Sequence, residues 1–374
     1  RGDQVSLDQE IAGARKEIVA DGYDMSVGEI MNLYKDEEIL INPSFQRLFR
    51  WTDSQKTRFI ESLLLGIPIP PIFVVQSEKG VWELIDGLQR LSTILEFAGL
   101  LRGENGAMAP ASSLGGTSFL PSLAGKRWEP SAEDADDGIG KEQQLQIKRA
   151  RLRVEILKKE SDPKAKFELF QRLNSGGANL TPQEVRNSVA VMLNPGFFDW
   201  LVQMSNDANF KLTTAQTEIA LEQQAGVELA LRFFVFRNVP YTSGLDVHEY
   251  LDQGLEMMAL NENFPRQAEE EVFTKTFQWL GEALGDRAFK KWNAQQNQFM
   301  GKFLMSSFEV IAIGVAANAA ALDGMAAAAR NDHLFARAQA LWSDATFNAH
   351  SGAGVRGTTR LANLLPIGPA FFAP

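Results

Sequence analysis

Five consecutive residues have the types and spacing that suit phosphate chemistry: Asp86-Gly87-Leu88-Gln89-Arg90. A carboxylate can hold Mg²⁺, a glycine lets the backbone approach a ligand closely, and an arginine offers a forked cation to phosphate. An amide such as that of Gln89 can orient an attacking water, as a glutamine does in some phosphoryl-transfer enzymes. Taken alone, these five residues are also compatible with a purely structural turn. In that case Asp-Gly only ends the strand, and the arginine pairs with a nearby carboxylate.

The flanking sequence places this turn between a strand and a helix. Residues 71–75 and 81–85 read as two short strands, and apolar residues from Leu91 onward recur at helical spacing. The free N–H groups and positive dipole end of such a helix favour an anion. Leu88, at the first helical position, has the spacing to face the core with Leu91 and Leu95.

A second set of cations lies on a predicted strand over residues 149–157, where polar and apolar residues alternate. Its polar face carries Arg149, Arg151 and Arg153. These arginines form a solvated sheet face, a wall of the anion site, or a contact for the phosphate backbone of DNA.

Composition narrows the range of functions. The chain has 374 residues, no cysteine and a formal net charge of −10. Disulfides, thiolate metal sites and cysteine nucleophiles are excluded, and any DNA contact must come from a local basic patch. Without an apolar run of membrane-spanning length or a signal peptide, we expect a cytoplasmic protein with no membrane partner.

The pattern along the chain predicts an α+β protein, in which a small mixed-sheet domain is followed by an all-helical domain. We expect a helical N-terminal extension over 1–25, a ligand-binding domain over 26–194 and a helical domain over 195–374. Residues 102–145, rich in Gly, Ser, Ala and Pro, read as a surface insertion with little core of its own. Within the last domain, helices are expected at 215–237, 247–260, 266–284, 295–322 and 331–345.

The three histidines, His248, His333 and His350, argue against a nuclease of the HNH type in this chain. That chemistry needs a histidine base beside metal-binding residues, and none of the three lies in such a cluster. Each is expected at the surface or at a helix cap.

Four boxes together resemble the N-terminal domain of GmrSD-type restriction endonucleases. Asp86-Gly87-Leu88-Gln89-Arg90 resembles the DGQQR signature of that family, with Leu88 where the family usually has Gln. The other three boxes follow the family's order: Phe45-Gln46-Arg47 with Arg50-Trp51 resembles "QR…W", residues 70–74 resemble "PPI(F/Y)V", and residues 172–187 resemble "RxNxGG…LTxxExRN". The resemblance covers about residues 26–195.

The resemblance implies a ParB/sulfiredoxin-like core that binds a nucleoside triphosphate with Mg²⁺ in bacterial restriction or anti-phage defence. Asp86 and Gln89 would be catalytic, and Asp86 would hold the metal ion. Further nucleotide contacts would converge on the turn from these residues: Gly87, Leu88, Arg90, Gln46, Arg47, Arg50, Arg172 and Asn174.

Two functions remain open from the sequence, and direct nicking of DNA by the N-terminal site is a third, weaker option. In the first, the protein hydrolyses the nucleotide; in the second, it is a non-hydrolysing nucleotide- or DNA-binding sensor or scaffold that switches a separate nuclease. If the Gln that Leu88 replaces is needed for catalysis, hydrolysis would be slow. DNA and a separate nuclease subunit are the expected partners, and a homo-oligomer stays open.

Overall fold

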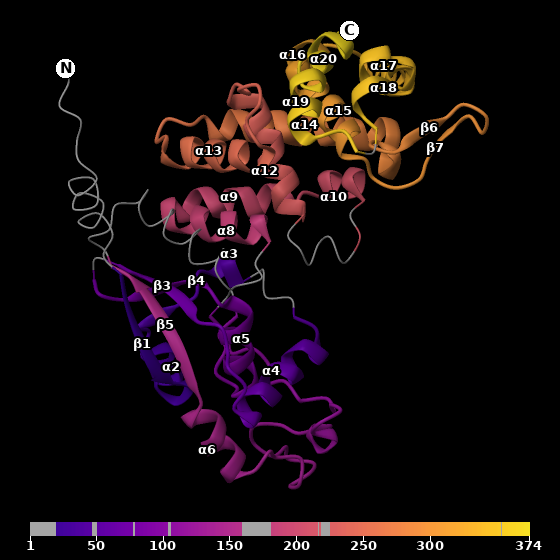
Figure 1. The fold of residues 1–374 in the computed structure, drawn as a ribbon. Coiled ribbons are helices and arrows are strands. Elements are labelled where there is room, and N and C mark those ends of the chain that lie inside the picture. Colours follow the sequence, from indigo (N-terminus) through magenta and orange to yellow (C-terminus); the bar gives the residue numbers. More distant parts are fainter. Residues whose placement is uncertain are drawn as a thin grey trace, which may run out of the picture. The chain divides into compact units, whose positions relative to one another are not determined.

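The computed structural model describes residues 20–46, 51–77, 79–103, 106–158, 181–215, 217, 225–352 and 354–374 (Figure 1). The chain divides into two compact units, Arg1–Leu180 and Thr181–Pro374. Of the helical extension expected over 1–25, residues 1–19 lie outside the described residues, and residues 20–25 belong to a strand.

The first unit is built on a five-stranded mixed sheet with the strand order β1-β5-β3-β4-β2. Its strands are β1 (Ala20–Ser26), β2 (Ile39–Leu40), β3 (Ile72–Gln76), β4 (Trp82–Asp86) and β5 (Arg151–Leu157). The predicted hairpin is confirmed as the antiparallel pair β3–β4, and β5 joins the other edge of β3 in parallel. A mixed sheet near the N-terminus is therefore confirmed, whereas strand β1 was not expected from the sequence.

Local signals in the sequence set the helices of this unit. These are α2 (Val27–Lys35), α3 (Pro43–Gln46), α4 (Asp53–Leu65), α5 (Leu88–Phe97) and α6 (Lys141–Arg149). Helix α4 begins in a capping box made by Thr52 and Gln55 and ends at the left-handed Gly66. Helix α5 packs against β3, which brings the N-terminus of α5 to the β3–β4 hairpin.

Two expectations for this unit are corrected. Residues 149–157 are not one strand, because Arg149 ends α6 and only 151–157 pair into the sheet. The insertion also has buried apolar side chains of its own, among them Leu114, Leu123 and Trp128. Trp128 packs edge-on against Phe97 of α5, with ring centroids 5.6 Å apart, so the insertion extends the core of the unit.

Among the residues that the structure describes, the second unit is helical apart from one two-stranded hairpin. Its main helices are α8 (Pro182–Leu193), α9 (Pro195–Ser205), α10 (Ala208–Thr214), α12 (Ala225–Asn238), α13 (Val247–Leu260), α14 (Arg266–Leu284), α15 (Met305–Ala317), α17 (Ala327–Ala340) and α19 (Gly357–Leu364). Helices α13 and α14 have the bounds that the sequence predicts. The expected helix 295–322 is wrong at its start, where β6 (Lys291–Asn293) and β7 (Gln298–Met300) form the hairpin.

Aromatic rings fill the core of the second unit. Phe233 on α12, Phe210 on α10, and Phe273 and Phe277 on α14 form a set of ring contacts with centroids 4.6–5.4 Å apart. Helix α12 is buried on nearly every side, which marks it as the central helix of this unit.

Candidate functional site: the turn between strand β4 and helix α5

The Asp86–Arg90 turn lies where the sequence predicts, between the end of β4 and the start of α5. Gly87 is the N-cap of the helix and has a left-handed backbone, with φ +93° and ψ 17°. A Cβ at this position would lie 2.3 Å from Cγ2 of Ile72 on strand β3. Both the backbone angle and the close approach therefore require glycine here.

The two charged residues of the turn are paired with each other. Nη2 of Arg90 lies 3.1 Å from Oδ2 of Asp86 and also donates to the carbonyl oxygen of Pro71, at 3.0 Å. Arg90 thereby joins the start of β3, the end of β4 and the first turn of α5. The Nε donor of Arg90 is buried and has no acceptor among the described residues.

Asp86 is 5% exposed, and this burial is the main influence on its charge. Burial raises the pKa of the Asp86 carboxyl, and it outweighs the opposing effects of Arg90 and of the Gly87 backbone N–H. A second cation near this carboxylate would therefore stabilise its ionised form.

The two residues between Gly87 and Arg90 have different surroundings. Leu88 is 5% exposed and faces the core together with Leu91 and Leu95, as its spacing predicts. Gln89 accepts a hydrogen bond at Oε1 from the backbone N–H of Trp51, at 3.0 Å. The last residue of the "QR…W" box is thus held beside the turn by Gln89.

Five further residues were expected to contact the nucleotide, and the structure describes only one of them, Gln46. The Gln46 side chain donates to the carbonyl oxygen of Arg102, and no contact joins it to the turn among the described residues. Arg47, Arg50, Arg172 and Asn174 lie outside the described residues, so their convergence on the turn stays a prediction.

The three arginines expected to contact DNA are not equivalent. Arg149 lies on α6, while Arg151 and Arg153 are on the exposed face of β5, opposite the buried Leu152 and Val154. Arg153 is held by carboxylates, with Nε 2.6 Å from Glu155 and Nη1 3.4 Å from Asp24 on the neighbouring strand β1. The structure therefore gives no single basic face of three free arginines.

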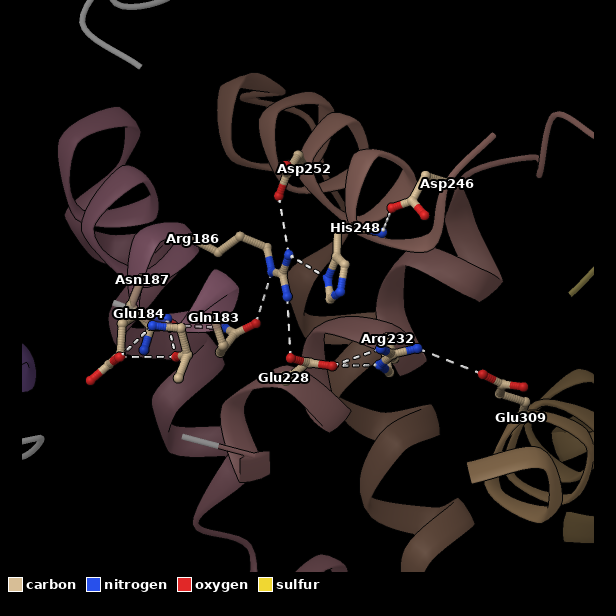
Figure 2. Close-up of polar contacts among 11 residues, drawn as sticks. Gln183, Glu184, Arg186, Asn187, Glu228, Arg232, Asp246, His248, Asp252 and Glu309 are labelled. Atoms are coloured by element: carbon tan, nitrogen blue, oxygen red, sulfur yellow. Dashed lines mark hydrogen bonds and ion pairs between the residues drawn. The ribbon is translucent and has the colours of Figure 1, made fainter. Parts of the chain in front are cut away.

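A buried ionic network in the second unit was not predicted from the sequence (Figure 2). Arg186 of α8 is 1% exposed. Its guanidinium lies 3.2 Å from Glu228 on α12 and 3.3 Å from Asp252 on α13, and it donates to Gln183 at 2.9 Å. His248, expected at the surface or a cap, is exposed and lies 3.4 Å from the same guanidinium.

The network continues through the helical core. Glu228 pairs with Arg232 at 2.7 Å, and Arg232 lies 3.6 Å from Glu309, which is fully buried on α15. Glu309 in turn accepts from Arg360 on α19, at 2.7 Å. Sequence reasoning missed the network because Arg186 is separated from Glu228 by 42 residues and from Asp252 by 66, beyond the reach of any helical or strand spacing.

Two features that would point to other classes of protein are absent from the residues that the structure describes. No three His, Cys, Asp or Glu side chains among them lie close enough to hold a metal ion together. In the same residues, no helix is both long and apolar enough to cross a membrane.

Comparison with protein families gives a match over residues 27–191, to the family described as the GmrSD restriction endonuclease, N-terminal domain. This segment is a GmrSD-type N-terminal domain. The match contains the whole β4–α5 turn and the network residue Arg186, and it indicates a component of a restriction or anti-phage defence system. No curated protein and no solved structure matches the chain significantly.

The GmrSD-type segment extends beyond the first unit. Its last box contributes Glu184, Arg186 and Asn187, all on α8 of the second unit. Glu184 completes a capping box with Thr181, and Asn187 accepts from Gln183 at 2.8 Å. In this chain these three residues of the box therefore begin and anchor helix α8.

Proposed function

We propose that the GmrSD-type domain binds the phosphates of a nucleoside triphosphate at the β4–α5 turn and hydrolyses it with Mg²⁺, as part of a restriction or anti-phage defence system. The observation that carries the proposal is the turn itself. A left-handed glycine, a buried carboxylate and a half-buried arginine meet at the N-terminus of a ten-residue helix, and the buried Nε of that arginine has no acceptor among the described residues.

The residues present fit both ligands. Phosphate oxygens would accept from the first backbone N–H groups of α5 and from Arg90. Asp86 is a single carboxylate, which suits Mg²⁺ because this ion takes one or two protein carboxylates and completes its shell with phosphate oxygens and water. Bound Mg²⁺ would neutralise charge on the phosphates during hydrolysis.

Binding would exchange the partners of the ion pair. In the structure Asp86 and Arg90 satisfy each other. With phosphate at the turn, Arg90 would donate to an anion and Asp86 would face a metal cation, so neither buried charge would be left without a partner. The proposal thus keeps the electrostatic balance of the site.

A second candidate function is favoured by the hydrogen bond of Gln89 and the burial of Leu88. Gln89 Oε1 already accepts from Trp51, and Leu88 is buried where the family usually has Gln. In this alternative the domain binds nucleotide without turnover and acts as a switch for a separate nuclease.

One experiment separates the candidates. Affinity for each triphosphate with Mg²⁺ is measured by calorimetry, and phosphate release is measured with and without DNA. Arg90→Gln should weaken binding by about 2 kcal/mol, roughly 30-fold, because a charge-assisted contact is lost. Asp86→Asn should keep much of the binding and lose Mg²⁺-dependent release. Lys290→Gln, which changes a partly exposed cation paired with Asp286, is the control.

The outcomes are distinct once circular dichroism shows that each variant is folded. Binding without phosphate release selects the switch. Equal affinity of Arg90→Gln and the wild type for every triphosphate would rule out phosphate binding at this turn.

A further inference from the structure

A groove of about 770 Å³ lies in the first unit, away from the β4–α5 turn. It runs between the end of α4, the segment that follows it, the outer face of α6 and the start of β5. The lining residues are Leu63–Ile69, Glu142, Leu145, Gln146 and Arg149–Arg151. None of them has a part in the nucleotide site proposed above.

Three large aliphatic side chains of this groove are open to solvent. Leu65 is 46% exposed, Ile67 is 48% exposed and Leu145 is 37% exposed. Single exposed apolar residues are ordinary on a protein surface, but a group of them around one groove marks an interaction site.

Two exposed arginines flank the same groove. Arg149 and Arg151 make no ion pair with any residue that the structure describes. Arg153, two residues further along β5, is held by Asp24 and Glu155. In a chain of net charge −10, two cations with no carboxylate partner among the described residues are positioned for an anionic group from elsewhere.

The groove is formed by segments that are fixed in place. Gln146 of α6 donates to the carbonyl oxygen of Leu64 on α4, at 2.6 Å, and so ties the two helices together. Gly66 ends α4 in a left-handed conformation, and Pro68 stiffens the segment that follows. A partner would therefore meet a preformed surface, which lowers the entropic cost of association.

We propose that this groove docks an acidic amphipathic segment of a partner protein. Apolar side chains of the segment would cover Leu65, Ile67 and Leu145, and its carboxylates would pair with Arg149 and Arg151. Glu142 lies on the same face of α6, two turns before Arg149. It would set the orientation of the bound segment, because it repels an acidic end of that segment and favours a neutral or basic end.

The observations favour a protein segment over DNA. A phosphate backbone offers no apolar surface to the three aliphatic side chains, and Glu142 would repel phosphates that approach Arg149. Residues 65–68 are exposed along the groove, and this suits the groove-binding mode in which spaced apolar anchors of the bound segment carry the affinity.

The test begins with a phage-displayed library of random 16-residue peptides, selected against the full chain. The enriched peptide is synthesised, and its affinity is measured by fluorescence anisotropy at two salt concentrations. We expect enriched peptides to combine Asp or Glu with spaced Leu, Ile, Phe or Trp. Leu145→Glu and the pair Arg149→Glu with Arg151→Glu should each weaken binding by roughly tenfold or more, the range of interface hot spots.

Matched controls are available in the chain. Leu260→Glu changes a leucine on α13 that is 49% exposed, and Arg153→Gln changes the arginine already held by carboxylates; both should leave affinity unchanged. Failure to enrich any peptide, or peptide binding that ignores the groove variants, would overturn the proposal. A DNA duplex whose binding depends on Arg149 and Arg151 but not on Leu145 would overturn it in favour of a nucleic-acid surface.

Discussion

Arg90 holds Asp86 at 3.1 Å across the left-handed Gly87, so the two charges of the turn are each other's partner. Both side chains are largely buried, at 14% and 7% exposure. Removing one partner of a buried pair leaves the other charge without compensation, which costs more than removing both. This relationship governs how variants of the turn must be interpreted.

The first prediction is a strong coupling between the two positions. Arg90→Gln alone should lower the free energy of unfolding by about 3–5 kcal/mol, because Asp86 would stay buried without its cation. The double variant Arg90→Gln with Asp86→Asn should lose less than Arg90→Gln alone. Urea unfolding of the two single variants and the double variant gives the coupling energy; simple additivity would show that the pair does not interact.

The second prediction concerns the pH dependence of stability. Because burial raises the pKa of Asp86 above its ordinary 3.8, the folded chain holds this proton more tightly than the unfolded chain. This contribution to stability is complete below pH 3.8 and is lost as pH rises through the raised pKa. We therefore compare the unfolding free energies of the wild type and of Asp86→Asn. The value for the wild type minus the value for the variant should fall as pH rises from about 4. A difference that stays level from acid to neutral pH would contradict the assignment.

The third prediction separates backbone strain from close packing. Gly87→Ala places a Cβ at φ +93° and 2.3 Å from Ile72, whereas Gly80→Ala places one at φ +82° with only an ordinary contact at 3.9 Å. Strain alone costs about 1–3 kcal/mol, so Gly80→Ala should stay in that range and Gly87→Ala should exceed it. Thermal unfolding of both variants is the measurement, and equal losses would mean that the approach of Ile72 is unimportant.

The fourth prediction tests the departure from the family signature. Leu88→Gln restores the usual family residue at a position that is 5% exposed. Burying an amide without a partner should cost about 1–3 kcal/mol, with no gain in phosphate release. The variant is compared with Leu88→Met, which keeps the apolar volume. Faster release by Leu88→Gln would show that the glutamine reaches the nucleotide.

The fifth prediction addresses the network in the second unit. Burial raises the pKa of Glu228, but Arg232 and Arg186 outweigh it, so that the pKa lies below its ordinary 4.5. A lowered pKa contributes stability above pH 4.5 that is lost as pH falls through the folded value. Glu228→Gln should thus be less stable than the wild type at neutral pH, and the difference should shrink on acidification. Glu249→Gln, an exposed acid on α13, is the control.

Local signals in the sequence were enough to place the turn. Thr52 with Gln55 and Thr181 with Glu184 have the spacing of capping boxes and each pair begins a helix, and the burial of Leu88 follows from its spacing. These features depend on residues a few positions apart. The alternation of polar and apolar residues predicts a strand that starts two residues too early. The pattern alone cannot show that Arg149 still belongs to the last turn of α6.

Long-range contacts were beyond this kind of reasoning. Nothing in the spacing showed that Arg90 would also reach Pro71, or that Gln89 would hold Trp51 38 residues away. The same is true of strand β1, whose pairing with β5 joins segments 129 residues apart at Asp24 and Arg153. Pairings of this kind depend on the assembled fold and leave little trace in local composition.

The position of Arg186 has a consequence for modularity. The family-matched segment ends at residue 191, yet this arginine, inside it, depends on Glu228 and Asp252 outside it. A fragment cut at 191 would carry a helix whose buried guanidinium had lost both of its carboxylates. Chimeras between relatives should therefore be joined before Thr181. Helix α8 then stays together with the helices that carry the carboxylates of Arg186.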